Sequence, residues 1–222
     1  MHAVHQSQRI PAGNATLEAE IVVPEPALGV VLFAHGSGST RRSPRNREVA
    51  GELQAAGLAT VLAGLLTPEE EWVDARTGAL RFDIGLLAER VGALVDWALG
   101  QDQTADLSVG LFGASTGAAA ALVAAAARPA SVEAVVSRGG RPDLAGGLLR
   151  LVRQPVLLTV GERDPLVLEL NREAMQELGG EASLATVPCA SHLFEEPGAL
   201  EEVARLARDW FVSHLQPAPR RA

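Results

Sequence analysis

Short apolar runs that alternate with helical patterns are the feature that most limits the folds open to this chain. Such runs, each ending at a turn signal, are typical of strands buried on both faces of a parallel sheet. They occupy residues 30–34, 58–62, 107–112, 132–136 and 155–160, with weaker strand patterns at 15–23 and 183–187. Helical patterns lie between and after them, at 44–56, 82–99, 116–128, 166–178 and 198–215. We therefore predict an α/β fold with a mostly parallel central sheet and helices on both faces.

Local signals place several elements within this pattern. Ser43 is expected to cap a helix that opens at Pro44 and stops before Gly57. The run at 30–34 should be central in the sheet, and the segment 15–23 should lie near its edge. Residues 65–81 are expected to form a long loop on the functional rim.

Length and charge bound the kind of protein. The 222 residues suit a single domain spanning 1–222, with 217–222 as a loose tail, because no linker or internal repeat divides the chain. A net charge of -8 argues against binding to nucleic acid or anionic lipid.

The longest apolar run, 117–127, is too short to span a bilayer, and the first residues have no apolar core of the secretory kind. We expect no membrane association and a cytoplasmic location. The single cysteine, Cys189, excludes an internal disulfide or a cysteine-based zinc site, and we expect neither metal nor cofactor.

The motif Gly113-Ala114-Ser115-Thr116-Gly117 sits between a predicted strand and a predicted helix. This is the G-x-S-x-G pattern of a nucleophile elbow, in which a sharp turn lifts a serine hydroxyl clear of the sheet. Glycines are needed because side chains at Gly113 and Gly117 would meet the neighbouring backbone. Ser115 is the candidate nucleophile.

A serine hydroxyl needs a base to take its proton, and the base needs an acid to orient it. Asp164 follows the strand at 155–160, and His192 follows the last strand, so both lie at carboxyl ends of the sheet. The order Ser, Asp, His is the one that this kind of fold uses. Asp143 is the alternative acid. His192 is preferred as base over the terminal histidines, the histidine in the last helix, and His35, which is expected to shape the glycine turn after its strand.

Two backbone N–H groups are expected to hold the oxyanion of a tetrahedral intermediate. One belongs to Thr116, directly after the nucleophile, and the other to Ser37 in the glycine turn after the strand at 30–34.

These residues together resemble the α/β-hydrolase superfamily, and most closely its small dienelactone-hydrolase-like members. The resemblance runs from His35-Gly36-Ser37-Gly38 through Ser115, Asp164 and His192. It implies a single-domain α/β-hydrolase fold without a separate cap domain, and hydrolysis of a carboxylic ester or related acyl bond. Dienelactone hydrolase itself uses a cysteine nucleophile, so the serine at position 115 is a departure that leaves the substrate open.

Arginines near the predicted cleft suggest a substrate with an anionic group. Arg138 is the best single contact, followed by Arg42 and Arg41, because planar guanidinium groups suit carboxylate or phosphate groups. The alternative is that these arginines pair with the acidic residues at 69–71 or 195–196. The expected partner is a small-molecule ester, bound by a monomer or homodimer.

Other functions remain open on the same residues. An acyltransferase or thioesterase would use the same triad, and a hydrolase fold can also serve as a non-catalytic binding protein. A nucleotide-binding module is disfavoured because the third glycine of G-x-G-x-x-G would fall at Arg41.

Overall fold

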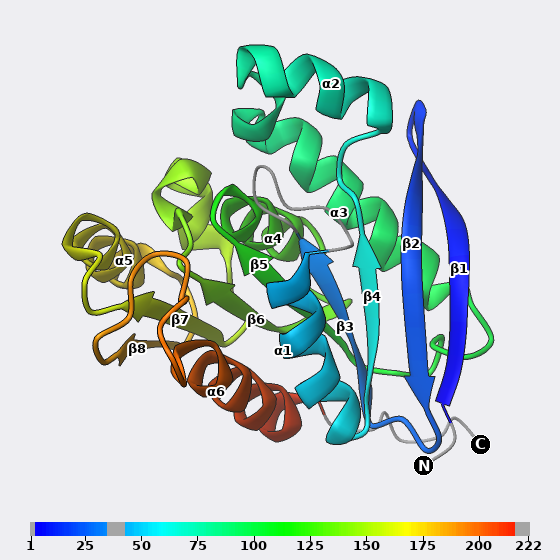
Figure 1. Cartoon of the computed structure of the whole chain (residues 1–222). Coiled ribbons are helices and arrows are strands. Elements are labelled where there is room, and N and C mark those ends of the chain that lie inside the picture. Colours follow the sequence, from blue (N-terminus) through cyan, green and yellow to red (C-terminus); the bar gives the residue numbers. More distant parts are fainter. Residues whose placement is uncertain (1–2, 35–42, 216–222) are drawn as a thin grey trace.

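The structure is a computed structural model that describes residues 3–34 and 43–215. Within these ranges eight strands form one sheet in the order β1-β2-β4-β3-β5-β6-β7-β8 (Figure 1). Neighbours from β4 and β3 through β8 are parallel, while β2 runs antiparallel to both β1 and β4. The predicted fold, a mostly parallel sheet in a single domain, is confirmed. The strands are β1 (Ala3–Ala12), β2 (Ala15–Pro24), β3 (Gly29–Ala34), β4 (Leu58–Ala63), β5 (Val109–Ala114), β6 (Val132–Arg138), β7 (Val156–Gly161) and β8 (Ala182–Val187).

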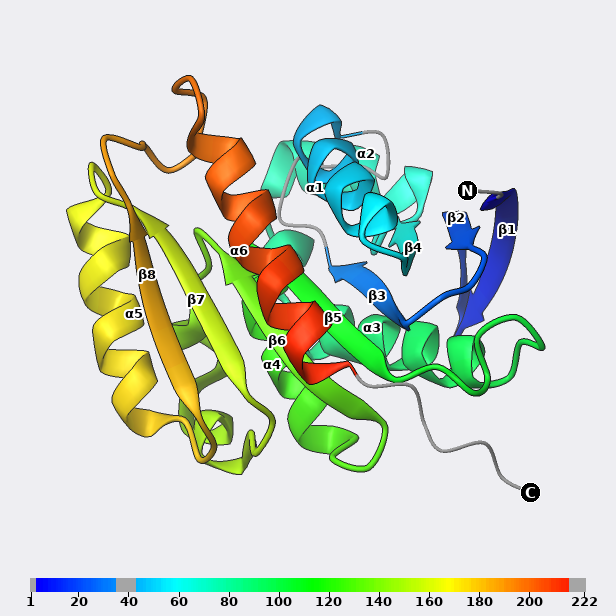
Figure 2. The same ribbon diagram turned by 90° about the horizontal axis from the view of Figure 1, so that it is seen from below.

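Helices cover both faces of the sheet (Figures 1 and 2). Helices α1 (Pro44–Ala55) and α6 (Ala199–His214) pack on one face. On the other face lie α3 (Ile84–Leu99), α4 (Thr116–Ala127), α5 (Pro165–Glu177) and the 3-10 segment η2 (Pro142–Leu151). Helix α2 (Pro68–Thr77) and the short η1 (Leu80–Phe82) follow β4 beyond its carboxyl end.

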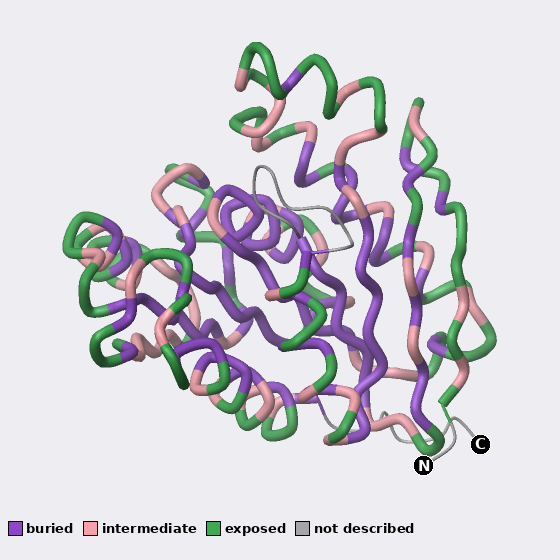
Figure 3. The backbone as a smooth tube through the Cα atoms, in the orientation of Figure 1, coloured by how far each residue is buried: buried purple, intermediate pink, exposed green. Residues whose placement is uncertain are grey.

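The central strands are buried on both faces, as their unbroken apolar sequences predict. β3, β4, β5 and β7 are buried at every residue, and the burial view places β3, β4 and β5 in the middle of the molecule (Figure 3). Phe33 and Phe112 fill the α1/α6 side, with ring centroids 4.8 Å apart. Helix α4 is buried almost all round, which explains a sequence of alanines with no polar face.

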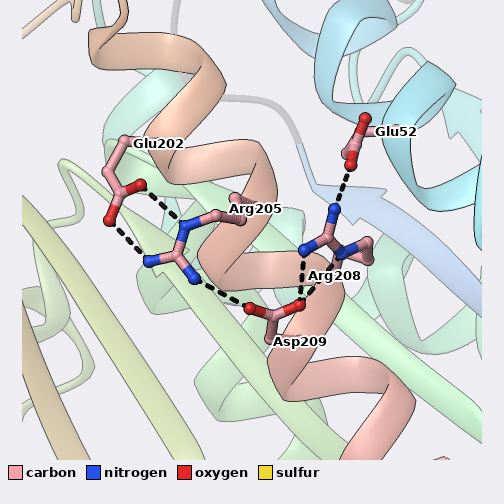
Figure 4. Close-up of polar contacts among 5 residues, drawn as sticks. All are labelled: Glu52, Glu202, Arg205, Arg208 and Asp209. Carbon is pink, nitrogen blue, oxygen red and sulfur yellow. Dashed lines mark hydrogen bonds and ion pairs between the residues drawn. The ribbon is translucent and has the colours of Figure 1, made fainter.

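A chain of charged side chains joins the outer surfaces of α6 and α1 (Figure 4). Arg205 binds Glu202 at 2.7 Å and Asp209 at 2.9 Å, Arg208 binds Asp209 at 2.8 Å, and Arg208 also reaches Glu52 on α1. Exposed ion pairs contribute little stability on their own. The buried contacts beneath them, rather than this network, hold the two helices together.

The segment 65–81 is not the predicted loop. Helix α2 begins at Pro68, and Thr67 and Glu70 form a reciprocal capping box at its start. Proline and acidic residues in a first turn favour a helix start, because the proline needs no N–H there and the acids face the positive end of the helix dipole. The prediction treated these same residues as loop signals.

Strand β1 was not predicted. It pairs with β2 over ten residues at the edge of the sheet, so β2 lies one strand in from the edge. An edge strand with alternating polar residues carries little apolar signal, which is why residues 3–12 gave none. The 3-10 segment η2 was missed as well. The predicted tail, 217–222, lies outside the described residues.

Helix α2 is fastened to the body by a buried arginine. Arg90 on α3, whose side chain is 2% exposed, donates to both carboxylate oxygens of Glu70 at 2.5 and 2.6 Å and to the Leu65 carbonyl at 2.5 Å. These bonds lower the pKa of Glu70. The folded protein therefore favours the ionised carboxylate, and this stabilisation is lost as the pH falls through the acidic range.

Replacing Glu70 with alanine should lower the free energy of unfolding by about 3 kcal/mol, because it leaves Arg90 buried and unpaired. Urea titration at neutral pH measures this, with the exposed neighbour Glu69→Ala as control. Removing both partners in Arg90→Met/Glu70→Ala should recover much of the loss. The difference in the free energy of unfolding between the wild type and Glu70→Gln should also become smaller at acidic pH. A Glu70→Ala variant as stable as Glu69→Ala would contradict the assignment.

Among the residues that the structure describes, no helix is long and apolar enough to cross a membrane.

Candidate active site

Ser115 sits in a backbone conformation that few residues adopt. Its φ is 52° and its ψ is -125°, between the end of β5 and the start of α4. A left-handed conformation costs a residue with a Cβ about 1–3 kcal/mol and persists only where its surroundings impose it. Here the Ser115 N–H donates to the Arg138 carbonyl at 3.3 Å, and the Ser115 carbonyl accepts from Arg141 N at 3.0 Å. The end of β6 and the segment after it thus hold the elbow.

Gly113 lets α4 approach β5 closely enough to form this turn. A Cβ added there would lie 2.5 Å from the Ala118 Cα and 2.8 Å from the Ala118 nitrogen. The close approach places the amino end of α4 directly behind Ser115. The Thr116 N–H is at the first position of that helix, where N–H groups have no partner within the helix and carry partial positive charge.

Asp164 and His192 lie in contact at the carboxyl-end edge of the sheet. Oδ2 of Asp164 is 2.7 Å from Nδ1 of His192, and the two side chains are 16% and 42% exposed. The other carboxylate oxygen accepts the N–H of Val167 at 3.4 Å and caps α5. With Nδ1 bound to the carboxylate, Nε2 of the imidazole is left to act on another group.

Gly139 places His192 beside the elbow. A Cβ on Gly139 would lie 3.2 Å from the His192 carbonyl oxygen and 3.6 Å from its Cε1, and Gly139 has a φ of 49°. Gly139 directly follows Arg138, which holds the Ser115 N–H. The imidazole therefore packs against Gly139, the neighbour of the residue whose carbonyl binds the Ser115 N–H.

The alternative acid is engaged elsewhere. Both carboxylate oxygens of Asp143 accept from Arg141, at 2.8 and 2.7 Å, whereas Asp164 binds the imidazole. His214 hydrogen bonds to the Trp210 carbonyl at the end of α6. The sequence prediction of Asp164 and His192 as neighbours agrees with this geometry.

Arg138, the last residue of β6, is 8% exposed. Its guanidinium carbon lies 5.9 Å from the centroid of the Phe112 ring, on the α1/α6 side of the sheet. Among the described residues its buried Nη1 has no hydrogen-bond partner, and no ion pair includes this guanidinium. Burial, and then the nearby charge of Arg45, lower the pKa of Arg138 to about 10. The group keeps its positive charge at neutral pH at a considerable cost of desolvation.

Arg45 was not singled out from the sequence. It lies in the first turn of α1, and its Nη1 is 3.4 Å from the exposed carboxylate of Glu195. No acidic residue occupies that turn. The sequence could have indicated this position, because the residue after Pro44 falls in the first turn of the predicted helix. Arg41, Arg42, Ser37 and His35 lie outside the described residues.

Within the described ranges, no group of three or more His, Cys, Asp or Glu side chains is placed to hold a metal ion.

Solved structures of known proteins resemble this fold closely. A dienelactone hydrolase from Anabaena variabilis is 54% identical, with a TM-score of 0.94 over 96% of this chain and 99% of the other. The chain belongs to the dienelactone-hydrolase-like α/β-hydrolases. A cold-adapted esterase from an Arctic intertidal metagenomic library shares the fold with this chain at 16% identity, with a TM-score of 0.76 over 96% of this chain and 95% of the other.

Two curated relatives from strains of Mycobacterium tuberculosis carry the name "Putative phosphoribosyl transferase". Each is 56% identical over 207 residues, which is 93% of this chain and 46% of the relative. The chain thus spans about half the length of the curated relatives that it matches. No protein-family model matches it.

Proposed function

We propose that this hydrolase cleaves carboxylic esters through an acyl-enzyme on Ser115. The observation that carries the proposal is the 2.7 Å contact between Asp164 and His192, next to an elbow that holds Ser115 at a φ of 52°. A base oriented by a carboxylate, beside a serine hydroxyl on a sharp turn, is the arrangement that activates a serine.

In the proposed mechanism, His192 takes the Ser115 proton through Nε2 as the hydroxyl oxygen attacks the ester carbonyl. Asp164 holds the Nδ1 proton and stabilises the imidazolium. The Thr116 N–H, at the amino end of α4, and the Ser37 N–H bind the oxyanion. His192 then protonates the leaving alcohol, and a water molecule activated by the same imidazole releases the acid.

A fluorophosphonate and a substrate panel test this proposal. The probe should label Ser115, as located by mass spectrometry of the digested protein. The panel holds aryl esters, a thioester, a lactone and an alcohol acceptor, so that it also separates hydrolysis from thioester cleavage and acyl transfer. Absence of both labelling and turnover would leave a non-catalytic binding protein as the better interpretation.

The name carried by the curated relatives does not alter this proposal. This chain accounts for 46% of their length, and that part has the fold of a hydrolase. We propose that any phosphoribosyl transfer by those proteins belongs to the remainder of their length.

We also propose that the preferred esters carry a carboxylate that Arg138 binds. Arg138 is a buried cation without an anionic partner among the described residues, and it lies close to Arg45 and to a helix start without acids. A bound anion would lower the energy at such a place. The planar guanidinium matches a carboxylate with two parallel hydrogen bonds. Among the described residues no ion pair joins Arg138 to the acids at 69–71 or 195–196, and two of these acids bind other arginines, Glu70 to Arg90 and Glu195 to Arg45.

Matched esters test the role of Arg138. Arg138→Met should lower kcat/KM about 10- to 100-fold on an aryl hemisuccinate, because a hydrogen-bonded charge is lost, and should change an aryl butyrate by less than about threefold. The exposed Arg150→Ala serves as control. Stability should not fall, because the substitution removes an unpaired buried charge. Equal decreases in kcat/KM on both esters would contradict a carboxylate-binding role for Arg138.

A further inference from the structure

The loop that carries His192 contains two residues in the left-handed region. Cys189 has a φ of 58° and Phe194 a φ of 55°, three residues before and two residues after the histidine. Residues with a Cβ hold such conformations only when neighbouring contacts favour them over the relaxed alternatives. Phe194 is anchored because its side chain is buried in the core, 2% exposed. Cys189 is exposed and has no such anchor.

A carboxylate from the neighbouring loop holds Cys189 instead. Oε2 of Glu162 accepts the Cys189 N–H at 2.7 Å, and the Glu162 N–H donates to the Val187 carbonyl at 3.0 Å. Arg163 N adds a bond of 2.9 Å to the Ala190 carbonyl. The loop that bears Asp164 is thereby joined to the loop that bears His192 by three hydrogen bonds.

The two loops also fit closely at Gly161. A Cβ there would lie 2.4 Å from the Ala190 carbonyl oxygen and 2.5 Å from that of Ser191. Since these are backbone atoms, a larger residue at position 161 could be accommodated only if the loop backbone moved.

A second carboxylate binds the histidine loop from its other end. Oε2 of Glu196 accepts the Ser191 N–H at 2.9 Å and the Ser191 hydroxyl at 3.3 Å. The bond from the Ser191 N–H is the first cause of a lowered pKa of Glu196. The Glu196 carboxylate is therefore bound in its ionised form to Ser191, the residue directly before His192.

We propose that Glu162 and Glu196 are positioning residues for His192. Their oxygens fix the peptide N–H groups of residues 189 and 191, so the imidazole is presented to Asp164 and to the elbow without searching other loop conformations. The inference rests on the proposed role of His192 as the base. A displacement of about 1 Å at such a base can cost on the order of 100-fold in rate, whereas a hydrogen bond on an exposed loop contributes little to global stability.

Alanine and glutamine variants separate positioning from folding. We expect Glu162→Ala and Glu196→Ala each to lower kcat about 5- to 50-fold on a neutral aryl ester, with KM within about twofold. Glu162→Gln and Glu196→Gln keep an oxygen acceptor and should recover most of the activity. Melting temperatures should stay close to wild type. Glu173→Ala, on the exposed side of α5, is the matched control and should behave as wild type.

A measurement that needs no turnover keeps this inference separate from the proposed function. The proton on Nδ1 of His192, bonded to Asp164, should give a low-field NMR signal that weakens in both alanine variants and returns with glutamine. That pattern would support the positioning role even if no ester is cleaved. Alanine variants with wild-type kcat and an unchanged signal would overturn it, as would glutamine variants as impaired as alanine.

Discussion

Ser115→Ala should abolish nearly all ester turnover, with kcat falling about 10⁴- to 10⁶-fold. In the proposed mechanism the Ser115 hydroxyl oxygen forms the acyl-enzyme, and no neighbouring group on the elbow can replace it, since Ala114 and Thr116 flank it and Thr116 is buried. What remains should be the small acceleration from oxyanion binding. Initial rates with an aryl ester and labelling by a fluorophosphonate measure the loss.

A glycine at the same position provides the control for folding. Ser115→Gly should be as inactive as alanine and yet more stable than it, because glycine adopts a φ of 52° without strain. Unfolding in urea reports this difference. An alanine variant that keeps wild-type turnover would show that another residue is the nucleophile.

The second large effect is expected from Asp164→Asn, which should lower kcat on the order of 10⁴-fold. An asparagine that turns its amide nitrogen toward His192 stabilises the wrong tautomer of the imidazole, so that Nε2 carries a proton and cannot act as a base. The same asparagine can still accept the Val167 N–H and cap α5. Stability should therefore change little, while Asp164→Ala should also lose about 1 kcal/mol of capping energy.

Asp143→Asn is the discriminating comparison, because Asp143 was the alternative acid. It should retain most of the activity, since its carboxylate is bound to Arg141 and not to the imidazole. Inactivity of Asp143→Asn together with an active Asp164→Asn would reverse the assignment. Steady-state rates across a range of pH would expose any change in the base at the same time.

The sequence was most informative about the parallel part of the sheet and the helices that flank it. Strands such as β3 are apolar throughout because both faces are covered, and helices such as α3 show the spacing of a one-sided apolar stripe. Strand β1 was not predicted because it pairs on one side only and is mostly exposed, so its sequence contains few apolar residues. Helix α2 was mistaken for a loop because Pro68 and the following acids are ambiguous between a turn and a helix start.

The site was predictable as far as chain order and strand ends go. Ser115 and Asp164 follow buried strands and His192 follows the half-buried edge strand β8, and parallel strands bring such positions to one edge. Contacts that depend on the exact path of a loop were not readable. The carboxylate of Glu162 binds the N–H of Cys189, whose backbone is left-handed, and the residue type at position 189 does not predict this conformation. The burial of Arg138 depends on β6 continuing two residues beyond its apolar run.

Asp164 divides its two oxygens between a helix and a histidine. Oδ1 closes the first turn of α5, and Oδ2 binds His192. Because both oxygens belong to one planar group, rotation of the carboxylate away from the imidazole also breaks the capping bond to Val167. The orientation of His192 is thereby coupled to the first turn of α5, and we expect fraying at the amino end of that helix to loosen the imidazole before the sheet unfolds.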